Sequence, residues 1–213
     1  MTRSLRNAGE GSDDLNVWPI FTDLLANAFL ILTTFLVIVL LLPLLQGNDE
    51  TKRQGPPPII TLPESESFRF SSGSAQLSPA FQASLRKTLI PQIEQLINDY
   101  DIDVVELIGH TDGQPNPGTG NLDTLINRSP ASRLVPGSNA DLGLMRSLAV
   151  VQYLQQVQKK DKKFQGVQFR AYSAGSLFLP SGKPAPASNA NQPERRRIEI
   201  RFTRLGQQQT LGQ

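Results

Sequence analysis

The longest single pattern in the sequence is an apolar run from Ile20 to Leu45. At about 1.5 Å per residue, a helix of this length reaches roughly 39 Å, which is enough to cross a lipid bilayer with some tilt. The run is too long for the apolar part of a secretory signal, and no small-residue cleavage site follows it. The pattern therefore predicts an uncleaved membrane helix at residues 20–45.

Polar side chains interrupt this run on one face of the predicted helix. Asp23, Asn27 and Thr34 recur with helical spacing, whereas the opposite face is apolar. An ionised carboxylate costs about 2.5–3.5 kcal/mol at the centre of a bilayer and less near the interface, where Asp23 is expected to lie. These residues leave two interpretations open. Asp23 is either an interfacial residue of a simple anchor or an ion-carrying carboxylate that faces a partner subunit.

The remainder of the chain divides into a linker, one domain and a short tail. Residues 46–65 are rich in proline and glycine, a composition typical of an extended tether. From residue 66 to residue 205, strand-like and helix-like periods follow one another in the order β-α-β-α-β-β, which predicts an α+β domain with helices on one face of a sheet. The strands are expected at 68–70, 104–108, 167–172 and 197–202, and the helices at 79–97 and 141–158. Residues 1–19 and 206–213 are expected to form polar tails.

The two predicted helices carry further signals. Ser78 followed by Pro79 is typical of an N-cap and a first helical position. Pro91 predicts a kink in the first helix, because proline has no backbone N–H to donate. The residues expected on the buried side of the second helix are Leu144, Leu148, Val151 and Leu154.

Composition excludes several classes of chemistry. A net charge of +2 is too small to indicate a nucleic-acid partner. The absence of cysteine excludes disulfides and thiolate sites, and with His110 as the single histidine we expect no metal site, no cofactor and no enzyme activity. We expect His110 to be a structural hydrogen-bonding residue. Two long loops, at 113–139 and 173–194, are expected to be either functional or disordered.

Three motifs occur in order within the predicted domain. They are Gly109-His110-Thr111-Asp112, then Asn139-Ala140-Asp141-Leu142-Gly143-Leu144-Met145-Arg146, and finally Arg195-Arg196-Arg197-Ile198-Glu199-Ile200. Together they closely resemble the OmpA-like peptidoglycan-binding domain over residues 66–205. The insertion after Asp112 is longer than is usual in that family, and Ser147 stands where alanine is usual.

The resemblance implies a site for the diaminopimelate of a peptidoglycan stem peptide. Asp112 is expected to bind its ammonium group and Arg146 its carboxylate, since arginine pairs with carboxylates through two parallel charge-assisted hydrogen bonds. The same resemblance implies supporting roles for the remaining motif residues. Thr111 adds a hydrogen bond, Asn139 and Leu142 line the pocket, and Arg196 or Arg197 supports it. Taken singly, Asp112 is better explained as a turn-stabilising residue and Arg146 as a solvated helix residue, and it is the ordered set of motifs that favours the binding role.

The N-terminal segment Trp18-Pro19-Ile20-Phe21-Thr22-Asp23 resembles the start of the membrane helix of flagellar-stator-type B subunits, a group that includes MotB, PomB and ZorB. The resemblance implies that Asp23 binds and releases a coupling ion, H⁺ or Na⁺. It also implies a homodimer within a ring of polytopic MotA/ZorA-like subunits, in the bacterial inner membrane with the N-terminus cytoplasmic and the domain periplasmic.

Three functional alternatives follow from these resemblances. The first is a flagellar-type ion-driven rotary motor, and the second is the same type of motor used in anti-phage defence, as in Zorya systems. The third is a passive tether between membrane and cell wall, in which Asp23 is incidental. No amphipathic period typical of a plug helix follows the membrane segment.

Overall fold

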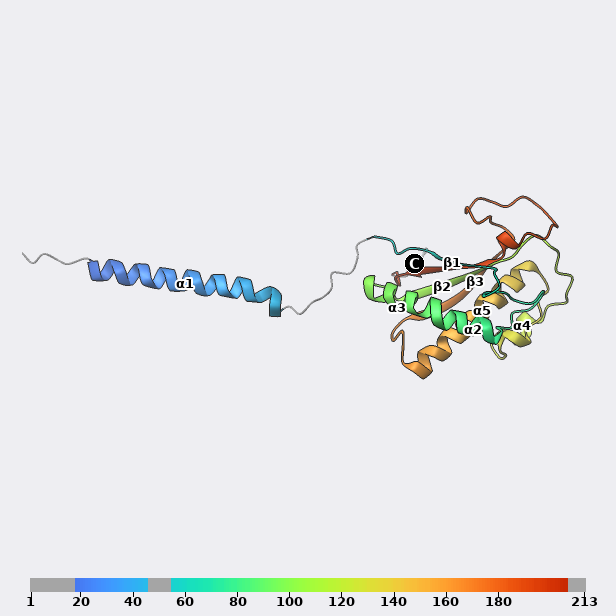
Figure 1. The fold of residues 1–213 in the computed structure, drawn as a ribbon, viewed down its shortest axis with the longest axis horizontal. Helices are drawn as coiled ribbons and strands as arrows, with labels where there is room; N and C mark the ends of the chain where they lie inside the picture. Colours follow the sequence, from blue (N-terminus) through green and yellow to red (C-terminus); the bar gives the residue numbers. More distant parts are fainter. Residues whose placement is uncertain (1–17, 46–54, 207–213) are drawn as a thin grey trace, which may run out of the picture. The chain divides into compact units, whose positions relative to one another are not determined.

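The computed structural model describes residues 18–45 and 55–206 and divides the chain into two units, Met1–Thr51 and Lys52–Gln213. The N-terminal unit holds α1 (Trp18–Leu45), shown in blue in Figure 1. Its segment Trp18–Leu42 has a mean hydropathy of 2.7 and is long and apolar enough to span a membrane by length and composition. The expected helix is confirmed and begins at Trp18. The predicted tails, apart from a few residues next to the described ranges, and residues 46–54 of the predicted linker lie outside the described residues.

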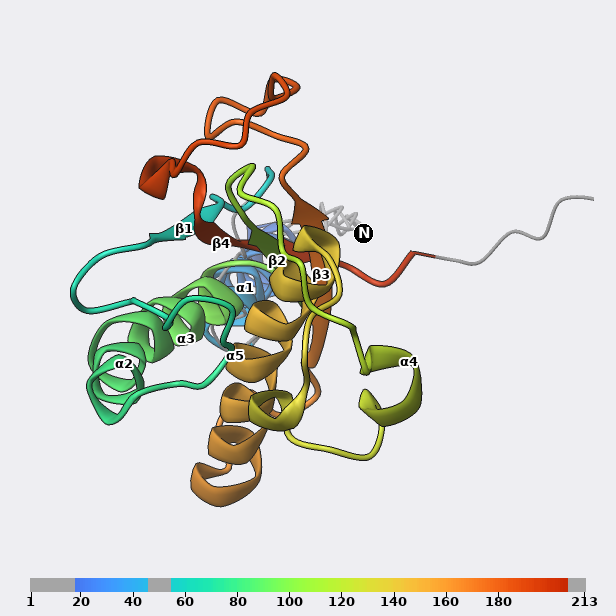
Figure 2. The same cartoon turned by 90° about the vertical axis from the view of Figure 1, so that its right-hand side faces the viewer.

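The second unit is built on a four-stranded sheet in the order β1-β4-β2-β3. Its strands are β1 (Ile60–Pro63), β2 (Val104–His110), β3 (Gln168–Gly175) and β4 (Arg197–Thr203). β4 pairs antiparallel with both β1 and β2, whereas β2 and β3 are parallel. Figure 2 shows α3 and α5 on the same face of this sheet, where their apolar side chains form one core with the inward-facing strand residues. The predicted α+β architecture and the order of its elements are confirmed.

The first helical segment follows its predicted start signal. α2 (Pro79–Ser84) begins after Ser78, whose Oγ accepts a hydrogen bond from the backbone N of Phe81 at 3.1 Å. A π-helical turn (Leu85–Leu89) then leads into α3 (Ile90–Asp99). Ile90 donates to the carbonyl of Leu85, and Pro91 directly after it has no N–H to donate. The irregularity expected at Pro91 therefore takes the form of a π-helical turn.

The first strand is not where the sequence pattern predicted it. Phe68-Arg69-Phe70 is irregular, and the strand is instead β1, inside the stretch expected to be a linker. The alternation at 68–70 has another cause, because both phenylalanine rings pack edge-on against Phe81, with ring centroids 5.5 and 4.8 Å away. The folded domain thus begins upstream of residue 66.

α5 (Asn139–Asp161) is buried on more of its circumference than its leucine stripe predicted. Val151 and Leu154 are buried as expected, whereas Leu144 and Leu148 are only half-buried. The extra buried residues are Leu142, Met145, Ala149, Val150 and Val157. α5 contacts β2 and β3 and also the short 3₁₀ helix Ala131–Arg133, so its side chains are covered from several directions.

A close backbone contact sets the position of α5 on the sheet. A Cβ atom placed on Gly109 would lie 1.9 Å from the carbonyl oxygen of Gly143, so the first two motifs meet where β2 and α5 touch. This contact places the residues after β2 beside the N-terminal turns of α5.

Candidate functional site

The predicted binding residues gather at one end of the sheet. β2 ends at His110, which is paired with Arg197 at the start of the antiparallel strand β4. Asp112 lies just beyond the end of β2 and Arg196 just before the start of β4, so the two residues are close in space. Nη1 of Arg196 lies 2.5 Å from Oδ2 of Asp112. Arg146 reaches the same place from the second turn of α5.

Asp112, Arg146 and Arg196 line an open cleft of about 810 Å³. Both long loops contribute to its rim, through Gln114 and Asn116 in one loop and Asn191 in the other. Short helical segments, α4 (Leu122–Leu125) among them, occur within the first loop. The predicted site residues that line the cleft are Thr111, Asp112, Asn139, Leu142, Arg146 and Arg196.

Asp112 is buried at the floor of the cleft and is held by both long loops. Its Oδ1 accepts a hydrogen bond from the backbone N of Gln114, and its Oδ2 accepts one from the backbone N of Gln192, each at 3.3 Å. Arg196 donates to Oδ2 as well. The carboxylate therefore stabilises the loops and also faces the cleft, so the two interpretations offered by the sequence are compatible.

Arg146 is buried but keeps part of its guanidinium available. The group lies over the ring of Phe70 at 5.2 Å from the centroid, its Nε donates to the carbonyl of Ser74 at 3.2 Å, and its Nη2 donates to the carbonyl of Ser71 at 3.4 Å. Within the described residues its Nη1 donates no hydrogen bond. Burial lowers the pKa of Arg146, while the nearby Glu64 carboxylate opposes that change. A charged donor edge therefore remains free to bind an anionic group.

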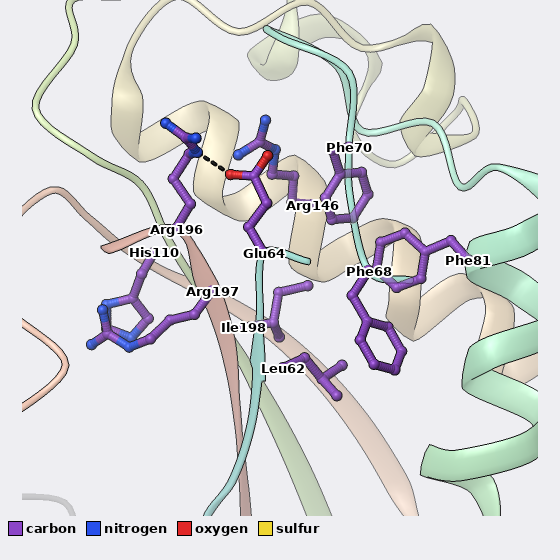
Figure 3. Close-up of a pocket in the computed structure, with 10 residues that line it drawn as sticks. All are labelled: Leu62, Glu64, Phe68, Phe70, Phe81, His110, Arg146, Arg196, Arg197 and Ile198. Atoms are coloured by element: carbon purple, nitrogen blue, oxygen red, sulfur yellow. Dashed lines mark hydrogen bonds and ion pairs between the residues drawn. The ribbon is translucent and has the colours of Figure 1, made fainter. Parts of the chain in front are cut away.

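Glu64 belongs to the site, and sequence reasoning missed it. It follows β1 directly, opposite Arg196, and its backbone N donates to the carbonyl of Arg196 at 3.0 Å. Its side chain forms an ion pair with Nε of Arg196, and Figure 3 shows its carboxylate between the guanidinium groups of Arg196 and Arg146. The alternating segment Ile60-Thr61-Leu62 is the signal that could have placed Glu64 at a strand end. We call Glu64, Asp112, Arg146 and Arg196 the cleft cluster.

Arg196 connects the two acids of the cleft cluster. Burial lowers its pKa, but the hydrogen bonds to Glu64 and Asp112 outweigh burial and raise the pKa overall. Its Nη1 also donates to Oδ1 of Asn191 at 2.6 Å. Its Nε and Nη1 are therefore directed at protein acceptors, which agrees with the predicted supporting role, whereas Nη2 donates no hydrogen bond within the described residues.

Arg197 lies outside the cleft, contrary to the suggestion that it supports the pocket. Neighbouring residues of a strand point to opposite faces, and Arg197 is buried where its Nη2 donates to Oε1 of Glu199 at 2.8 Å and to the carbonyl of Leu179 at 3.1 Å. His110 lies beside this pair, with Nε2 3.3 Å from the same Glu199 oxygen. We call His110, Arg197 and Glu199 the buried cluster.

The imidazole of His110 is neutral at pH 7. Burial and the charge of Arg197 lower the pKa of His110 to about 4, in spite of the opposing effect of Glu199. Neither ring nitrogen forms a hydrogen bond with the described residues, so the hydrogen-bonding role expected for His110 is not found there. Its role is to fill the core beside Arg197.

The remaining predicted residues shape the cleft. Asn139 donates from Nδ2 to the carbonyl of Gln114 at 2.8 Å and so fixes the first loop, and Leu142 is a buried apolar part of the wall. Thr111 is anchored by its backbone N, which donates to the carbonyl of Gly175 at 2.8 Å. Its buried Oγ1 has no hydrogen-bond partner in the described part of the chain.

The second candidate site lies on α1. The hydroxyl groups of Thr22, Thr33 and Thr34 donate to carbonyl oxygens of their own helix at 2.6, 2.9 and 2.7 Å. Asp23 and Asn27 are exposed, and neither is hydrogen-bonded to another described residue. They are therefore the polar groups of this helix that need an external partner in an apolar surrounding. In the described ranges, no group of three or more His, Cys, Asp or Glu side chains is placed to hold a metal ion.

No protein-family model matches the chain, and no curated protein matches it. Solved structures do match. A MotB-like protein from Desulfovibrio vulgaris is 19% identical with a TM-score of 0.40, over 69% of this chain and 76% of that one. The periplasmic domain of Helicobacter pylori MotB is 18% identical with a TM-score of 0.38, over 71% and 83%. The cell wall anchor of the T6SS from Pseudomonas aeruginosa is 19% identical with a TM-score of 0.36, over 68% and 81%.

Proposed function

We propose that this chain is a single-pass membrane protein that anchors itself to peptidoglycan through the cleft. The observation that carries this proposal is the convergence of Asp112, from the end of β2, and Arg146, from α5, on one open cleft. Diaminopimelate presents an ammonium group and a carboxylate on one carbon, and these groups need an acid and a base at short range. Such binding requires no covalent step, so we propose a binding role rather than a catalytic one.

Each lining residue has a part in this proposal. Asp112 retains oxygen lone pairs toward the cleft and binds the ammonium group, while the free Nη1 edge of Arg146 binds the carboxylate. The unpaired hydroxyl of Thr111 supplies an additional hydrogen bond, because an unsatisfied buried hydroxyl gains most from a new partner.

Arg146→Ala tests the anchoring role. In the full chain held in detergent micelles, we expect the affinity for a diaminopimelate-containing muropeptide to fall at least about tenfold, because a charge-assisted contact contributes about 1.5–3 kcal/mol. Isothermal titration calorimetry measures the change. The matched control is Arg170→Ala, on β3 and outside the cleft, which should bind like the natural chain. Equal affinities in both variants would refute the proposal.

We further propose that Asp23 carries a coupling ion, H⁺ or Na⁺, between this chain and polytopic MotA/ZorA-like subunits, with two copies of this chain forming a homodimer. The support is a carboxylate and an amide, Asp23 and Asn27, on an apolar helix whose hydroxyl groups are already satisfied. Binding of peptidoglycan by the domain would place the N-terminus in the cytoplasm and the domain in the periplasm.

A pull-down of the tagged chain from native membranes, followed by mass spectrometry, tests this second step. A multi-spanning partner in stoichiometric excess supports a motor, and the process that partner serves distinguishes flagellar use from anti-phage use. Asp23→Asn should abolish ion flux while the complex stays assembled, and Thr22→Val is the matched control because its hydroxyl serves only its own helix. Recovery of the chain without such a partner, together with unchanged behaviour of Asp23→Asn, would favour the passive tether.

A further inference from the structure

The cleft cluster contains equal numbers of opposite charges. Glu64 and Asp112 are its acids, and Arg146 and Arg196 are its bases, so their formal charges sum to zero at neutral pH. Without Glu64, a single carboxylate would face two guanidinium groups. Arg69 also lines the cleft, but its side chain is 64% exposed and solvent screens its charge. Among the less exposed groups, Glu64 therefore decides whether this part of the cleft is neutral or positive.

The position of Glu64 is fixed by the fold. Residues Ile60 to Pro63 pair with Ile200 to Arg197, so Glu64 comes next in register, directly opposite Arg196. The backbone hydrogen bond from Glu64 to Arg196 extends that register by one residue. Cross-strand neighbours of opposite charge pair readily, and here the pair lies in the cleft wall.

Glu64 also controls which groups remain available to a ligand. It occupies Nε of Arg196, while Asp112 and Asn191 occupy Nη1, so within the described residues Nη2 is the one nitrogen of this guanidinium group without a protein acceptor. The Glu64 carboxylate also lies near Arg146 (Figure 3), where its charge raises the pKa that burial lowers. Glu64, Arg146 and Arg196 also line a small cavity of about 20 Å³, which has room for about one water molecule. A ligand must therefore bind these residues from the side of the open cleft.

We propose that Glu64 is a specificity-determining residue that makes the cleft selective for a zwitterionic amino-acid head over a purely anionic group. This inference rests on the proposed binding of peptidoglycan at the same cleft. A head with one ammonium and one carboxylate enters a neutral cluster and leaves it neutral. An anion without the ammonium meets two carboxylates that it cannot compensate, and its affinity is lowered by like-charge repulsion.

Removal of the Glu64 charge should convert the cleft into an anion site. In Glu64→Gln the cluster carries one excess positive charge, and Arg196 is left with Asp112 as its acidic partner. Asp112 is then neutralised more completely and attracts the ammonium group less. Binding of the zwitterion weakens, and binding of the corresponding anion does not.

The test compares two forms of one ligand, using the full chain in detergent micelles. One form is a diaminopimelate-containing muropeptide with a free side-chain amine, and the other is the same muropeptide with that amine acetylated. The natural chain should prefer the free amine about tenfold or more, and Glu64→Gln should reduce this preference at least fivefold. Glu64→Asp should restore part of it, because the charge is kept. Glu66→Gln is the matched control, since Glu66 is exposed and does not line the cleft.

The preference between two ligands separates a role in specificity from a role in folding. A loss of folded protein lowers both apparent affinities equally and leaves their ratio unchanged. An unchanged ratio in Glu64→Gln, with binding still weakened by Arg146→Ala, would overturn the role of Glu64 and leave the proposed function intact. Failure of the natural chain to bind either form would overturn the proposed function and the inference with it.

Discussion

Arg196 and Arg197 are adjacent in the chain, and each is paired with a carboxylate, but they belong to regions with different tasks. The side chain of Arg196 is 18% exposed and lies in the cleft cluster, whereas that of Arg197 is 3% exposed and lies in the buried cluster. Arg195, before them, is also buried and donates to the carbonyl of Ser176 at 2.6 Å, which fixes the loop before β4. The difference teaches that identical side chains in one motif receive their roles from the alternation of the strand.

The largest effect should come from the buried cluster. Arg197→Ala leaves the half-buried carboxylate of Glu199 without its closest cation, and loss of one partner of a buried pair costs up to about 3–5 kcal/mol in the free energy of unfolding. Denaturant unfolding of the full chain in micelles measures this loss. Arg201→Ala is the matched control, because Arg201 pairs with the same carboxylate from an exposed position and should cost no more than about 1 kcal/mol. Equal losses of unfolding free energy in Arg197→Ala and Arg201→Ala would show that the buried cluster contributes no more to stability than an exposed ion pair.

Acid should weaken the buried cluster next. The folded pKa of His110, about 4, lies below the usual value of 6.5, so the unfolded chain binds a proton more readily between these two pH values. Stability should therefore fall by about 3 kcal/mol as the pH is lowered from 7 to 4. Unfolding curves at several pH values measure this slope, and His110→Gln should flatten it above pH 5. A slope unchanged by His110→Gln would assign the acid sensitivity to other groups.

A smaller effect on stability, with a clear effect on binding, is expected from the cleft. Arg196→Ala should reduce muropeptide affinity about tenfold, because Asp112 and Glu64 lose the group that holds them in place, while unfolding changes by about 1–2 kcal/mol. Titration calorimetry and unfolding of the same sample give both values. A variant that binds normally but unfolds as readily as Arg197→Ala would assign Arg196 to the core.

The smallest effect is expected at the rim. Arg69 is 64% exposed, and its Nε lies 3.8 Å from Oε1 of Glu64, so solvent screens the pair. Arg69→Ala should change the free energy of unfolding by less than about 0.5 kcal/mol and muropeptide affinity by no more than about twofold. A larger loss of affinity would extend the ligand contact from the cleft cluster to the rim.

The sequence was most informative where a functional residue follows a strong local pattern. Asp112 comes two residues after a β-branched strand, and Arg146 lies within the helix predicted at 141–158, so the ordered motifs could place both in advance. The alternation of residues 60–62 could at most place Glu64 at a strand end. Its position opposite Arg196 was not predictable, because β1 has four residues, ends in proline and pairs with a strand more than a hundred positions away. Local periodicity contains no information about such a pairing.

Two errors have related physical causes. The alternation at residues 68–70 reflects packing of two rings on Phe81 and involves no strand pairing, and period alone does not distinguish the two. Arg197 could be assigned to one face of β4 or the other only after the loop at 173–194 was placed, since that loop supplies the carbonyls that bind it. The alternation of side chains along β4 was predictable from the sequence, but which of its two faces borders the cleft was not.

β1 is an edge strand, and among the described residues it is also the first strand after α1. A mechanical load that travels along the backbone from the N-terminal side therefore reaches the domain through the four residue pairs between β1 and β4. The next residue is Glu64. Traction that peels β1 from β4 would withdraw Glu64 from Arg196 and change the charge of the cleft before the core yields. If the cleft binds peptidoglycan as proposed, its affinity for that ligand would thus depend on the mechanical tension applied at the start of β1.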